Sequence, residues 1–294
     1  MIVVTTPTGA IGKQVVEKLL ESGQSVRVIV REPSHLPPHT RERVEVVQGS
    51  HGDRDVVIRA FKGAEAVFWL VPPSPRNPSV EAAYVDFTQP ACEAFRSQGV
   101  RRVVGVSALG RGLPLARNAG LVTASLEKDD LIVASGVSYR ALTMPSFMDN
   151  LLRQVDPIKN RGVFFSPLSG NRKLPSCATR DIAAAAANLL VDSSWSGQDD
   201  VAVLGPEDLS FNEMAQIMSE VLGKTVRFQQ IPFEGYRARL IEQGMSEAMA
   251  QGMADMMAAK NEGLDNAEPR NAQNSTPTSF RLWCEEVLKP AVLG

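Results

Sequence analysis

The first twelve residues of the chain, MIVVTTPTGAIG, combine an apolar β-branched run with a short loop rich in threonine and glycine. The run predicts a buried strand, and the amphipathic stretch KQVVEKLLES after it predicts a helix. Gly9 can let the backbone approach a pyrophosphate, and Gly12 can let the helix pack against the strand. The N–H groups of Gly9, Ala10 and Ile11 would then face the phosphates at the positive end of the helix. The residue types and their spacing therefore predict a dinucleotide site.

The loop departs from the three-glycine fingerprint at its first position, where Thr6 stands. Glycine is favoured there because the backbone is left-handed, which costs a β-branched residue free energy. Thr5, Thr6 and Thr8 carry hydroxyl groups that can donate hydrogen bonds to phosphate. The alternative is an ordinary strand–turn–helix without a ligand, but the surrounding βαβ pattern favours phosphate binding.

The end of the second expected strand distinguishes NAD from NADP. An acidic residue there would bind the ribose 2′-hydroxyl and select NAD. This chain has Arg31 instead, followed by Glu32. Because a guanidinium can pair with a 2′-phosphate and stack on adenine, we expect NADP(H) as the cofactor. The alternative is a solvated surface arginine.

These residues need a scaffold, and the first half of the chain supplies one. Short apolar runs alternate with amphipathic stretches, as in repeated βα units around a parallel sheet covered on both faces. We expect an α/β fold with a Rossmann-type doubly wound parallel sheet. The expected strands are 2–5, 25–30, 44–48, 66–71, 102–107 and 138–143, and the expected helices are 12–22, 53–61, 80–98 and 125–135.

The rhythm changes after residue 150. We expect residues 1–150 to form the dinucleotide-binding domain and 151–294 a smaller α/β cap, interleaved with the first domain. Ser210 and Glu213 form a capping box for a helix over 211–222, and a Met-rich helix is expected over 233–259, interrupted by glycines. Residues 261–279 are polar and rich in Pro and Asn, which predicts a mobile loop. Strands at 201–204 and 226–231 and helices at 180–192 and 280–288 complete the expected cap region.

Composition narrows the class of protein. The 294 residues carry a formal net charge of −2, which gives no reason to expect binding to nucleic acid or an anionic membrane. No apolar run has the length of a membrane span, and the chain begins with a strand rather than a signal peptide. The three cysteines are far apart and the three histidines lie in expected loops, so we expect no disulfide framework and no metal. His51 could touch adenine, but we expect a solvated loop side chain. A cytoplasmic protein is expected.

An ordered set of motifs resembles a known family. The stretches TTPTGAIGKQVVEKLL, VIVREPS, VVQGSHGDRDVV, GVSALG, LIVASGVSYRALTMPSFMDNLL and RDIAAAAANLL follow one another along nearly the whole chain. Together they resemble the NmrA-like family of atypical short-chain dehydrogenase/reductases. The family includes NAD(P)H-dependent reductases of quinones, dyes and isoflavone-type substrates. It also includes redox-sensing regulators that bind the dinucleotide without turning it over.

The resemblance implies further cofactor residues. Thr8, Gly9, Ala10, Ile11 and Gly12 would form the phosphate loop, and Arg31 would bind the 2′-phosphate. Gly49 and Ser50, in the turn after the third strand, would also contact the cofactor, with Ser50 at the position where the family usually has an acid. The remaining implied cofactor contacts are Val71 and Pro72 after the fourth strand, Ser107 at the end of the fifth, and Pro145, Ser146 and Phe147 after the sixth.

The catalytic dyad of the wider superfamily, a tyrosine with a lysine four residues later, is absent. Alignment on LIVASGVSYRAL places Thr123 at the tyrosine position and Glu127 at the lysine position. Lys128 is one step away, roughly 100° around the helix, which predicts that it points elsewhere. Ser107 and Thr123 are the candidate catalytic residues, with Ser125 and Tyr84 as further polar candidates. Each also has a structural interpretation, such as a helix cap or a loop contact.

The expected substrate pocket is apolar. Its expected residues are Tyr84, Phe147, Met148, Phe164, Met249 and Met253, although methionines at helical spacing also pack in cores. Two functions stay open. The first is an NADPH-dependent reductase of a hydrophobic, aromatic small molecule such as a quinone or dye, by direct hydride transfer. The second is a non-catalytic NADP(H)-binding redox sensor that acts through a protein partner.

Overall fold

The computed structural model describes residues 1–294, and the chain forms two compact units. The first unit consists of Met1–Ala108, Ala124–Thr143 and Ile182–Val201, and the second of Leu109–Thr123, Met144–Asp181 and Ala202–Gly294. The division therefore differs from the expected boundary at residue 150. The chain returns to the first unit at Ile182, where it supplies most of a helix and the last strand of the sheet.

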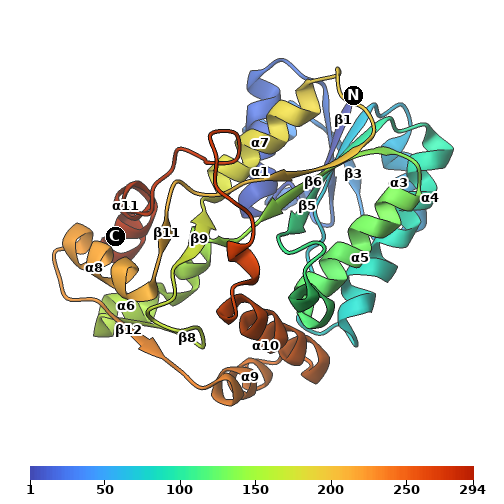
Figure 1. Ribbon diagram of the computed structural model, residues 1–294. Helices are drawn as coiled ribbons and strands as arrows, with labels where there is room; N and C mark the ends of the chain where they lie inside the picture. The colour runs from blue at the N-terminus through green and yellow to red at the C-terminus, as the bar shows by residue number, and fades with distance from the viewer. The chain divides into compact units, whose positions relative to one another are not determined.

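A seven-stranded sheet in the order β10-β6-β5-β4-β1-β2-β3 forms the centre of the first unit (Figure 1). The pairings of β1 with β2 and β4, of β2 with β3, and of β4 with β5 are parallel. The strand order reverses between β1 and β4, and at such a point the carboxyl ends of the strands leave a crevice for a ligand. The strands are β1 (Ile2–Thr5), β2 (Val26–Val30), β3 (Glu45–Gln48), β4 (Ala66–Trp69), β5 (Arg102–Ala108), β6 (Ser138–Met144) and β10 (Gln198–Ala202).

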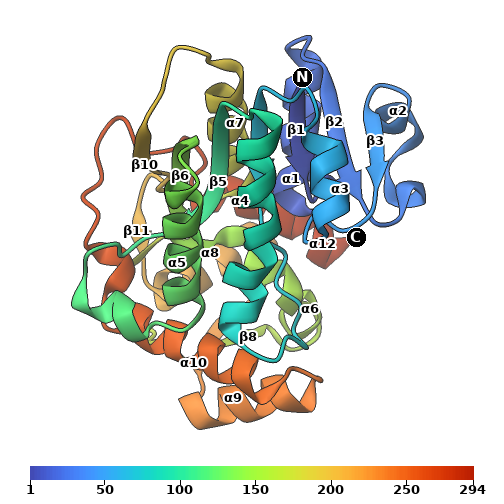
Figure 2. The same ribbon diagram turned by 90° about the vertical axis from the view of Figure 1, so that its right-hand side faces the viewer.

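Helices cover both faces of this sheet, with α3, α4 and α5 on one face and α1 and α7 on the other (Figure 2). The strands are apolar at nearly every position because both faces are buried, as at Val3, Val67 and Val103, which have no exposed surface. The helices are α1 (Ala10–Glu21), α3 (Arg54–Phe61), α4 (Phe87–Gln98), α5 (Leu121–Ala134) and α7 (Thr179–Val191), with the short η1 (Pro33–His35) and α2 (Pro38–Arg41) between β2 and β3.

The α/β Rossmann-type fold class is confirmed, and six strands lie within two residues of their expected bounds. Three elements differ from expectation. The helix expected over 125–135 begins four residues earlier, as α5 at Leu121. The helix expected over 80–98 contains a π-helical turn, η2 (Ala82–Asp86), which is followed by α4. Pro90 has no N–H to donate to the carbonyl of Asp86, which accounts for the irregular turn before it. The strand expected over 201–204 begins earlier and joins the main sheet as β10.

The second unit contains two small sheets, β11-β9-β7 and β12-β8. Its apolar core includes the fully buried side chains of Phe164, Met218, Phe280 and Trp283. The strands are β7 (Ser146–Phe147), β8 (Val163–Ser166), β9 (Leu174–Cys177), β11 (Asp208–Leu209) and β12 (Arg227–Gln230). The helices are η3 (Pro114–Asn118), η4 (Met148–Gln154), α6 (Val155–Arg161), α8 (Phe211–Leu222), α9 (Phe233–Glu242), α10 (Glu247–Asn261), η5 (Leu264–Asn266), α11 (Phe280–Trp283), η6 (Cys284–Leu288) and α12 (Lys289–Leu293).

Local signals account for the helix ends in this unit. The capping box of Ser210 and Glu213 is present as expected. The single helix expected over 233–259 is two helices, because Gly244 adopts φ +88° and the chain restarts at the N-cap Ser246.

The polar segment 261–279, expected as a mobile loop, has a defined path. It contains η5, and the backbone of Leu204 exchanges hydrogen bonds with Asn274 and Thr276. Polar side chains hold this path, so low hydrophobicity alone did not make the segment structureless.

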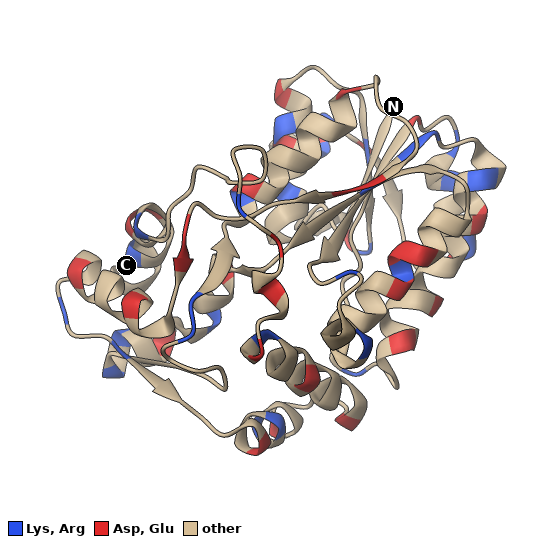
Figure 3. Ribbon diagram, in the orientation of Figure 1, with Lys and Arg blue, Asp and Glu red and all other residues tan.

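Charged side chains of both signs are interspersed over the helices and loops (Figure 3). None of the helices combines the length and apolar character that crossing a bilayer requires.

Candidate functional site

The loop between β1 and α1 has the backbone of a phosphate-binding turn. Thr6 adopts φ +51° and is the only non-glycine residue with positive φ, so it takes the conformation that the fingerprint assigns to its first glycine. The N–H of Gly9 donates to the carbonyl of Thr6 at 3.0 Å. A Cβ on Gly12 would lie 2.1 Å from the same carbonyl oxygen, so only glycine allows this close approach of helix and loop.

The residues of this loop fit an anion. The Oγ1 atom of Thr6 is buried and has no hydrogen-bond partner in the protein, which is costly unless a ligand supplies one. Thr8, Gly9 and Ala10 are exposed, and Gly9 caps α1 without a side-chain acceptor for the first N–H groups of the helix. The first turn of α1 contains no acidic residue. Free N–H groups at a helix N-terminus, with an orphan hydroxyl beside them, match the oxygens of a pyrophosphate.

Thr5 has a different role from the one expected. Its Oγ1 donates to the carbonyl of Phe68 at 3.0 Å and accepts from the N–H of Leu70 at 2.9 Å. The hydroxyl thus joins the ends of β1 and β4 and is not available to phosphate. Of the three loop threonines, Thr6 and Thr8 remain as donors to a ligand.

Arg31 follows β2 and is exposed. Its carbonyl accepts a hydrogen bond from Gln48 at 3.2 Å, which ties the turn to β3, while its guanidinium has no partner in the protein. An unpaired guanidinium beyond the second strand is the arrangement that a 2′-phosphate requires. Binding of NADP(H) by Arg31 therefore stays our prediction for this residue.

We expect the Arg31→Ala variant to bind NADPH roughly 10- to 100-fold more weakly and to leave the affinity for NADH unchanged within about twofold, because NADH has no 2′-phosphate to lose a charge-assisted pair. Fluorescence titration of both cofactors measures the two dissociation constants. Equal weakening of NADPH and NADH would remove Arg31 as the 2′-phosphate partner.

The turn after β3 contains a buried histidine. His51 was expected as a solvated loop residue, but it is 6% exposed and packs edge-on against the rings of Trp69 and Phe87. Its Nε2 lies 3.0 Å from the carbonyl of Leu70, which can only accept, so the proton is on Nε2. Burial lowers the pKa of His51 to about 4, against the opposing effect of the Leu70 carbonyl, and the Arg31 guanidinium lowers it further. His51 is therefore neutral at pH 7 and anchors the turn to the end of β4.

Gly49 and Ser50, the expected cofactor contacts of this turn, are partly exposed. Gly49 has φ +144°, and a Cβ there would lie 2.4 Å from Val56. At the end of β4, Val71 is buried and Pro72 is exposed. These four residues lie near the carboxyl ends of β3 and β4, as the prediction requires, and their contact with a cofactor stays a prediction.

Ser107, near the end of β5, belongs to a buried polar network that the sequence did not reveal. Its Oγ donates to Oδ2 of Asp129 in α5. Oδ1 of the same carboxylate accepts from the Tyr139 hydroxyl at 2.6 Å and lies 3.0 Å from Nζ of Lys128. Lys128 also donates to the carbonyl of Val106 at 2.5 Å. The side chains of Lys128 and Asp129 are 1% exposed, so two opposite charges are paired inside the unit.

This network changes the interpretation of two residues. Lys128 was expected to point elsewhere than the lysine of the dyad; in the structure its ammonium group lies against the backbone of β5. The proton of Ser107 is directed at Asp129, so the hydroxyl offers lone pairs rather than a free proton. Gly105 makes the network possible, because a Cβ there would lie 2.2 Å from the hydroxyl oxygen of Tyr139.

The positions of the missing dyad contain no acid–base pair. Thr123 Oγ1 donates to the carbonyl of Ala116 at 2.8 Å and accepts from the N–H of Ala119 at 2.9 Å, which is a structural role at the start of α5. Glu127 is exposed, and Ser125 is buried. The Thr123 hydroxyl therefore already donates one hydrogen bond and accepts another within the loop before α5.

Tyr84 is on the π-helical turn η2 and packs against the apolar core of the first unit. Burial raises the pKa of its phenol to about 12, so it stays protonated at neutral pH. A contact of Tyr84 with substrate stays a prediction.

The other expected ligand residues lie in the second unit. Ser146 and Phe147 form β7, which pairs with β9, and both are partly exposed, whereas Pro145 is buried. Met253 is partly exposed on α10. Met148, Phe164 and Met249 are at most 3% exposed, so they pack within the unit and offer a ligand almost no surface. Phe164 in particular packs against the rings of Phe211 and Phe228, which corrects its assignment to the pocket wall.

Histidine, cysteine and carboxylate side chains do not gather in groups of three or more that would hold a metal ion. The three cysteines are free and buried.

A doubly wound sheet with a glycine-rich phosphate turn at the end of β1 defines a dinucleotide-binding protein of the Rossmann class. Family models agree with this class: the NAD(P)H-binding family matches residues 7–193 and the NmrA-like family matches residues 129–283. The chain belongs to the NmrA-like family, and the names of its homologues mark it as an NAD(P)H-dependent oxidoreductase.

Two curated relatives that match this chain over most of their length are named as reductases. A (4-alkanoyl-5-oxo-2,5-dihydrofuran-3-yl)methyl phosphate reductase of Streptomyces griseus is 32% identical over 97% of this chain and 97% of its own. An NAD(P)H azoreductase of Xenophilus azovorans is 28% identical over 88% of this chain and 86% of its own. Among solved structures, an NADPH-dependent quinone oxidoreductase of Escherichia coli in complex with NADPH superimposes with a TM-score of 0.75 at 22% identity, covering 100% of this chain and 99% of the other.

Proposed function

We propose that this protein is an NADPH-dependent reductase of electron-poor, conjugated small molecules such as quinones, azo compounds or unsaturated lactones. The observation that carries the proposal is the hydrogen bond that the Ser107 hydroxyl donates to Asp129. In addition, the dyad positions at Thr123 and Glu127 hold no acid–base pair. A site without a ready proton donor suits acceptors that need none in the rate-limiting step.

Conjugated acceptors have this property. NADPH, when bound, supplies a hydride. After hydride addition to a quinone, an azo bond or an unsaturated lactone, the negative charge is delocalised over a conjugated system, so water can protonate the product later. A simple ketone would give a localised alkoxide, which needs a general acid during the transfer. The names of the relatives support this class, since one acts on an unsaturated lactone and another on azo compounds.

The chain's own residues would bind and orient rather than exchange protons. The N–H groups at the start of α1 and the hydroxyl of Thr6 would hold the pyrophosphate, and Arg31 would select the 2′-phosphate. The Lys128–Asp129 pair fixes the end of β5, so that Ser107 presents hydrogen-bond acceptors to its surroundings. Positioning of this kind contributes to rate by orienting the reactants.

A panel of acceptors tests the proposal with steady-state kinetics followed by NADPH absorbance. We expect turnover of 2-methyl-1,4-naphthoquinone, of an azo dye such as methyl red, or of a 3-acyl-2(5H)-furanone. Cyclohexanone should be reduced at least about 100-fold less efficiently, because a missing general acid costs about 10²–10⁴ in rate.

Two outcomes would contradict the proposal that the protein reduces conjugated acceptors without a general acid. Reduction of cyclohexanone at a comparable rate would show that the protein does supply an acid. Tight binding of NADPH without turnover of any acceptor would instead favour the non-catalytic redox sensor, for which the absence of the dyad is the motivating observation.

A further inference from the structure

A cavity of about 510 Å³ in the second unit is wide open to solvent, and each residue that lines it is polar. The loop between β8 and β9 contributes four of them, and the end of α10 with η5 contributes two. The volume exceeds that of a single phosphate group, so the cavity can admit the group together with part of the molecule that carries it. The lining residues are Ser169, Asn171, Arg172, Lys173, Asn261 and Asn266.

The side chains of this cavity present donors because the protein itself occupies their acceptors. The backbone N–H of Ser169 donates to Oδ1 of Asn261 at 2.8 Å, which leaves the Asn261 NH₂ group to donate. Oδ1 of Asn171 accepts from the side-chain amide of Asn212 at 2.8 Å, which leaves the NH₂ group of Asn171 to donate. The Oγ of Ser169 accepts from the N–H of Asn171 at 3.4 Å, and the hydroxyl proton of Ser169 is left to donate.

Two cations accompany these donors. Arg172 is exposed, and its guanidinium has no carboxylate partner in the protein. Gly263, at φ +99°, leaves room for it, since a Cβ there would lie 3.1 Å from Arg172 Nη1. Lys173 pairs with Glu213 at 2.7 Å, so one positive charge is balanced and that of Arg172 is not.

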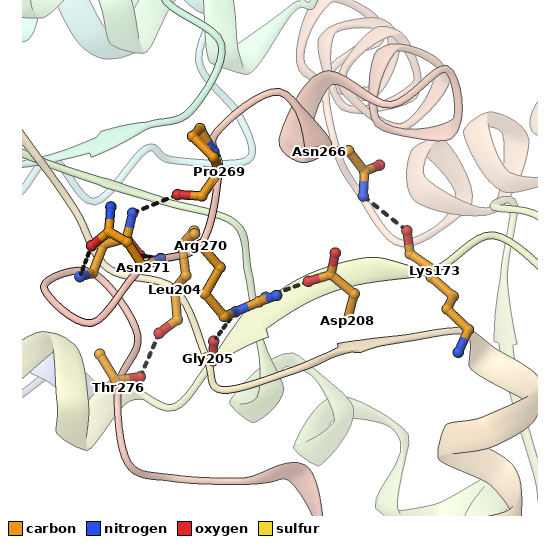
Figure 4. A network of polar contacts seen from close by, with 10 residues as sticks. Lys173, Leu204, Gly205, Asp208, Asn266, Pro269, Arg270, Asn271 and Thr276 are labelled. Atoms are coloured by element: carbon orange, nitrogen blue, oxygen red, sulfur yellow. Dashed lines mark hydrogen bonds and ion pairs between the residues drawn. The ribbon is translucent and has the colours of Figure 1, made fainter.

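Three carboxylates lie close in sequence or space to the cavity residues. Oδ2 of Asp265 pairs with Lys260, whereas its Oδ1 has no hydrogen-bond partner, and Glu262 is exposed. Glu213 is held by Lys173 and by the N–H and hydroxyl of Ser210, which lowers the pKa of its carboxyl to about 2. Asn266 donates its amide to the carbonyl of Lys173 at 3.0 Å, and Arg270 is tied to Asp208 and to the carbonyl of Gly205 (Figure 4). Among the side chains that line the cavity, Arg172 is the cation without a carboxylate partner, and Oδ1 of Asn266 is an acceptor that accepts no hydrogen bond from the protein.

We propose that this cavity is a binding site for a phosphate-type oxyanion, with Arg172 as its charged ligand and Ser169, Asn171 and Asn261 as neutral donors. A guanidinium together with several N–H and O–H donors matches the oxygens of a phosphate monoester or a similar anion. The anion is either part of the acceptor molecule that the enzyme reduces, which rests on the proposed function, or a free phosphate compound.

The first arm of the test is binding of inorganic phosphate, measured by isothermal titration calorimetry at constant ionic strength, which does not depend on turnover. The wild-type protein should bind phosphate, and Arg172→Met should weaken binding at least about tenfold. Asn261→Asp should do the same, because it keeps the acceptor for Ser169 but replaces the donor with a negative oxygen. Arg239→Met removes an exposed charge on α9 and is the matched control, with unchanged binding.

The second arm distinguishes the source of the anion. The ratio of kcat/KM for 1,4-naphthoquinone-2-sulfonate to that for 2-methyl-1,4-naphthoquinone should fall at least about fivefold in Arg172→Met if the anion belongs to the acceptor, and stay constant if a free phosphate compound occupies the site. If the wild-type protein reduces neither quinone, the proposed function fails and the first arm alone decides the site. Equal phosphate binding by wild type, Arg172→Met and Arg239→Met, with an unchanged kinetic ratio, would overturn the proposal.

Discussion

Replacing Lys128 with methionine is expected to lower the free energy of unfolding by about 3–5 kcal/mol, one of the largest losses that a single side chain of this protein can cause. The ammonium group is 1% exposed and lies 3.0 Å from Oδ1 of Asp129 and 2.5 Å from the carbonyl of Val106. Methionine would leave the buried carboxylate without its counter-charge. Ser107 and Tyr139 would still donate to that carboxylate, but two neutral donors do not replace a cation.

A double-mutant cycle separates the ion pair from the packing of the lysine stem. Asp129→Asn in the Lys128→Met background should cost less than Asp129→Asn alone, since no uncompensated charge then remains, with a coupling of about 1–3 kcal/mol. Urea unfolding followed by circular dichroism measures all three variants. Lys62→Met, at an exposed lysine of the same unit, should change stability by less than about 0.5 kcal/mol. A loss in Lys128→Met no larger than in this control would show that the pair contributes nothing.

The same lysine shows where pattern reasoning stops. The sequence places Lys128 beside Glu127 in LEKDD, and charged residues in a helix are ordinarily assigned to its solvated face. In the structure Glu127 is exposed, whereas Lys128 and Asp129 are buried. Their partners come from β5 and β6, the strands before and after α5 in the chain, and the space for Tyr139 depends on the absent side chain of Gly105. Nothing local in the helix encodes these contacts.

The phosphate loop is the opposite case, because its constraints are local. A strand, a turn with glycine at two positions and an amphipathic helix follow one another within 21 residues, so the sequence was sufficient to predict the turn and the strain at Thr6. Most of the main sheet was predictable for the same reason. The sequence did not predict that residues 182–201 return to the first unit, because a short strand does not indicate which of two units it joins. His51 was assigned to solvent since its partners, Trp69 and Phe87, are contributed by later elements.

The donor-rich cavity shows a third limit. Four of its residues come from the loop segment 169–173, in which only Gly170 does not line the cavity. A polar loop segment of this kind is ordinarily solvated. Its character depends on which atoms the protein has already used. The assignment of Asn261 as a donor follows from one backbone hydrogen bond across 92 residues, which no sequence pattern contains.

The second large effect is expected at Gly12. Alanine there would place a Cβ 2.1 Å from the carbonyl oxygen of Thr6 and 2.8 Å from its carbonyl carbon, both of which are backbone atoms that cannot rotate away. Either α1 must move away from β1 or the turn must open. We expect a loss of about 2–4 kcal/mol in unfolding free energy, as for overpacking at a rigid contact, and NADPH binding weakened by at least about 100-fold because the N–H groups no longer converge on the phosphates.

Two further glycine-to-alanine variants, at Gly9 and Gly235, serve as comparisons for Gly12→Ala. A Cβ on Gly9 would lie 3.4 Å from the Thr6 carbonyl, so Gly9→Ala should fold with nearly wild-type stability while a methyl group at the exposed loop interferes with the pyrophosphate. Gly235, in α9, has nothing within 4 Å of an added Cβ, and Gly235→Ala should leave binding unchanged and raise stability by up to about 1 kcal/mol. Thermal unfolding and NADPH titration of the three proteins measure both quantities. If Gly12→Ala kept the stability and affinity of Gly235→Ala, the close approach of Gly12 to Thr6 would not be what builds the cofactor loop.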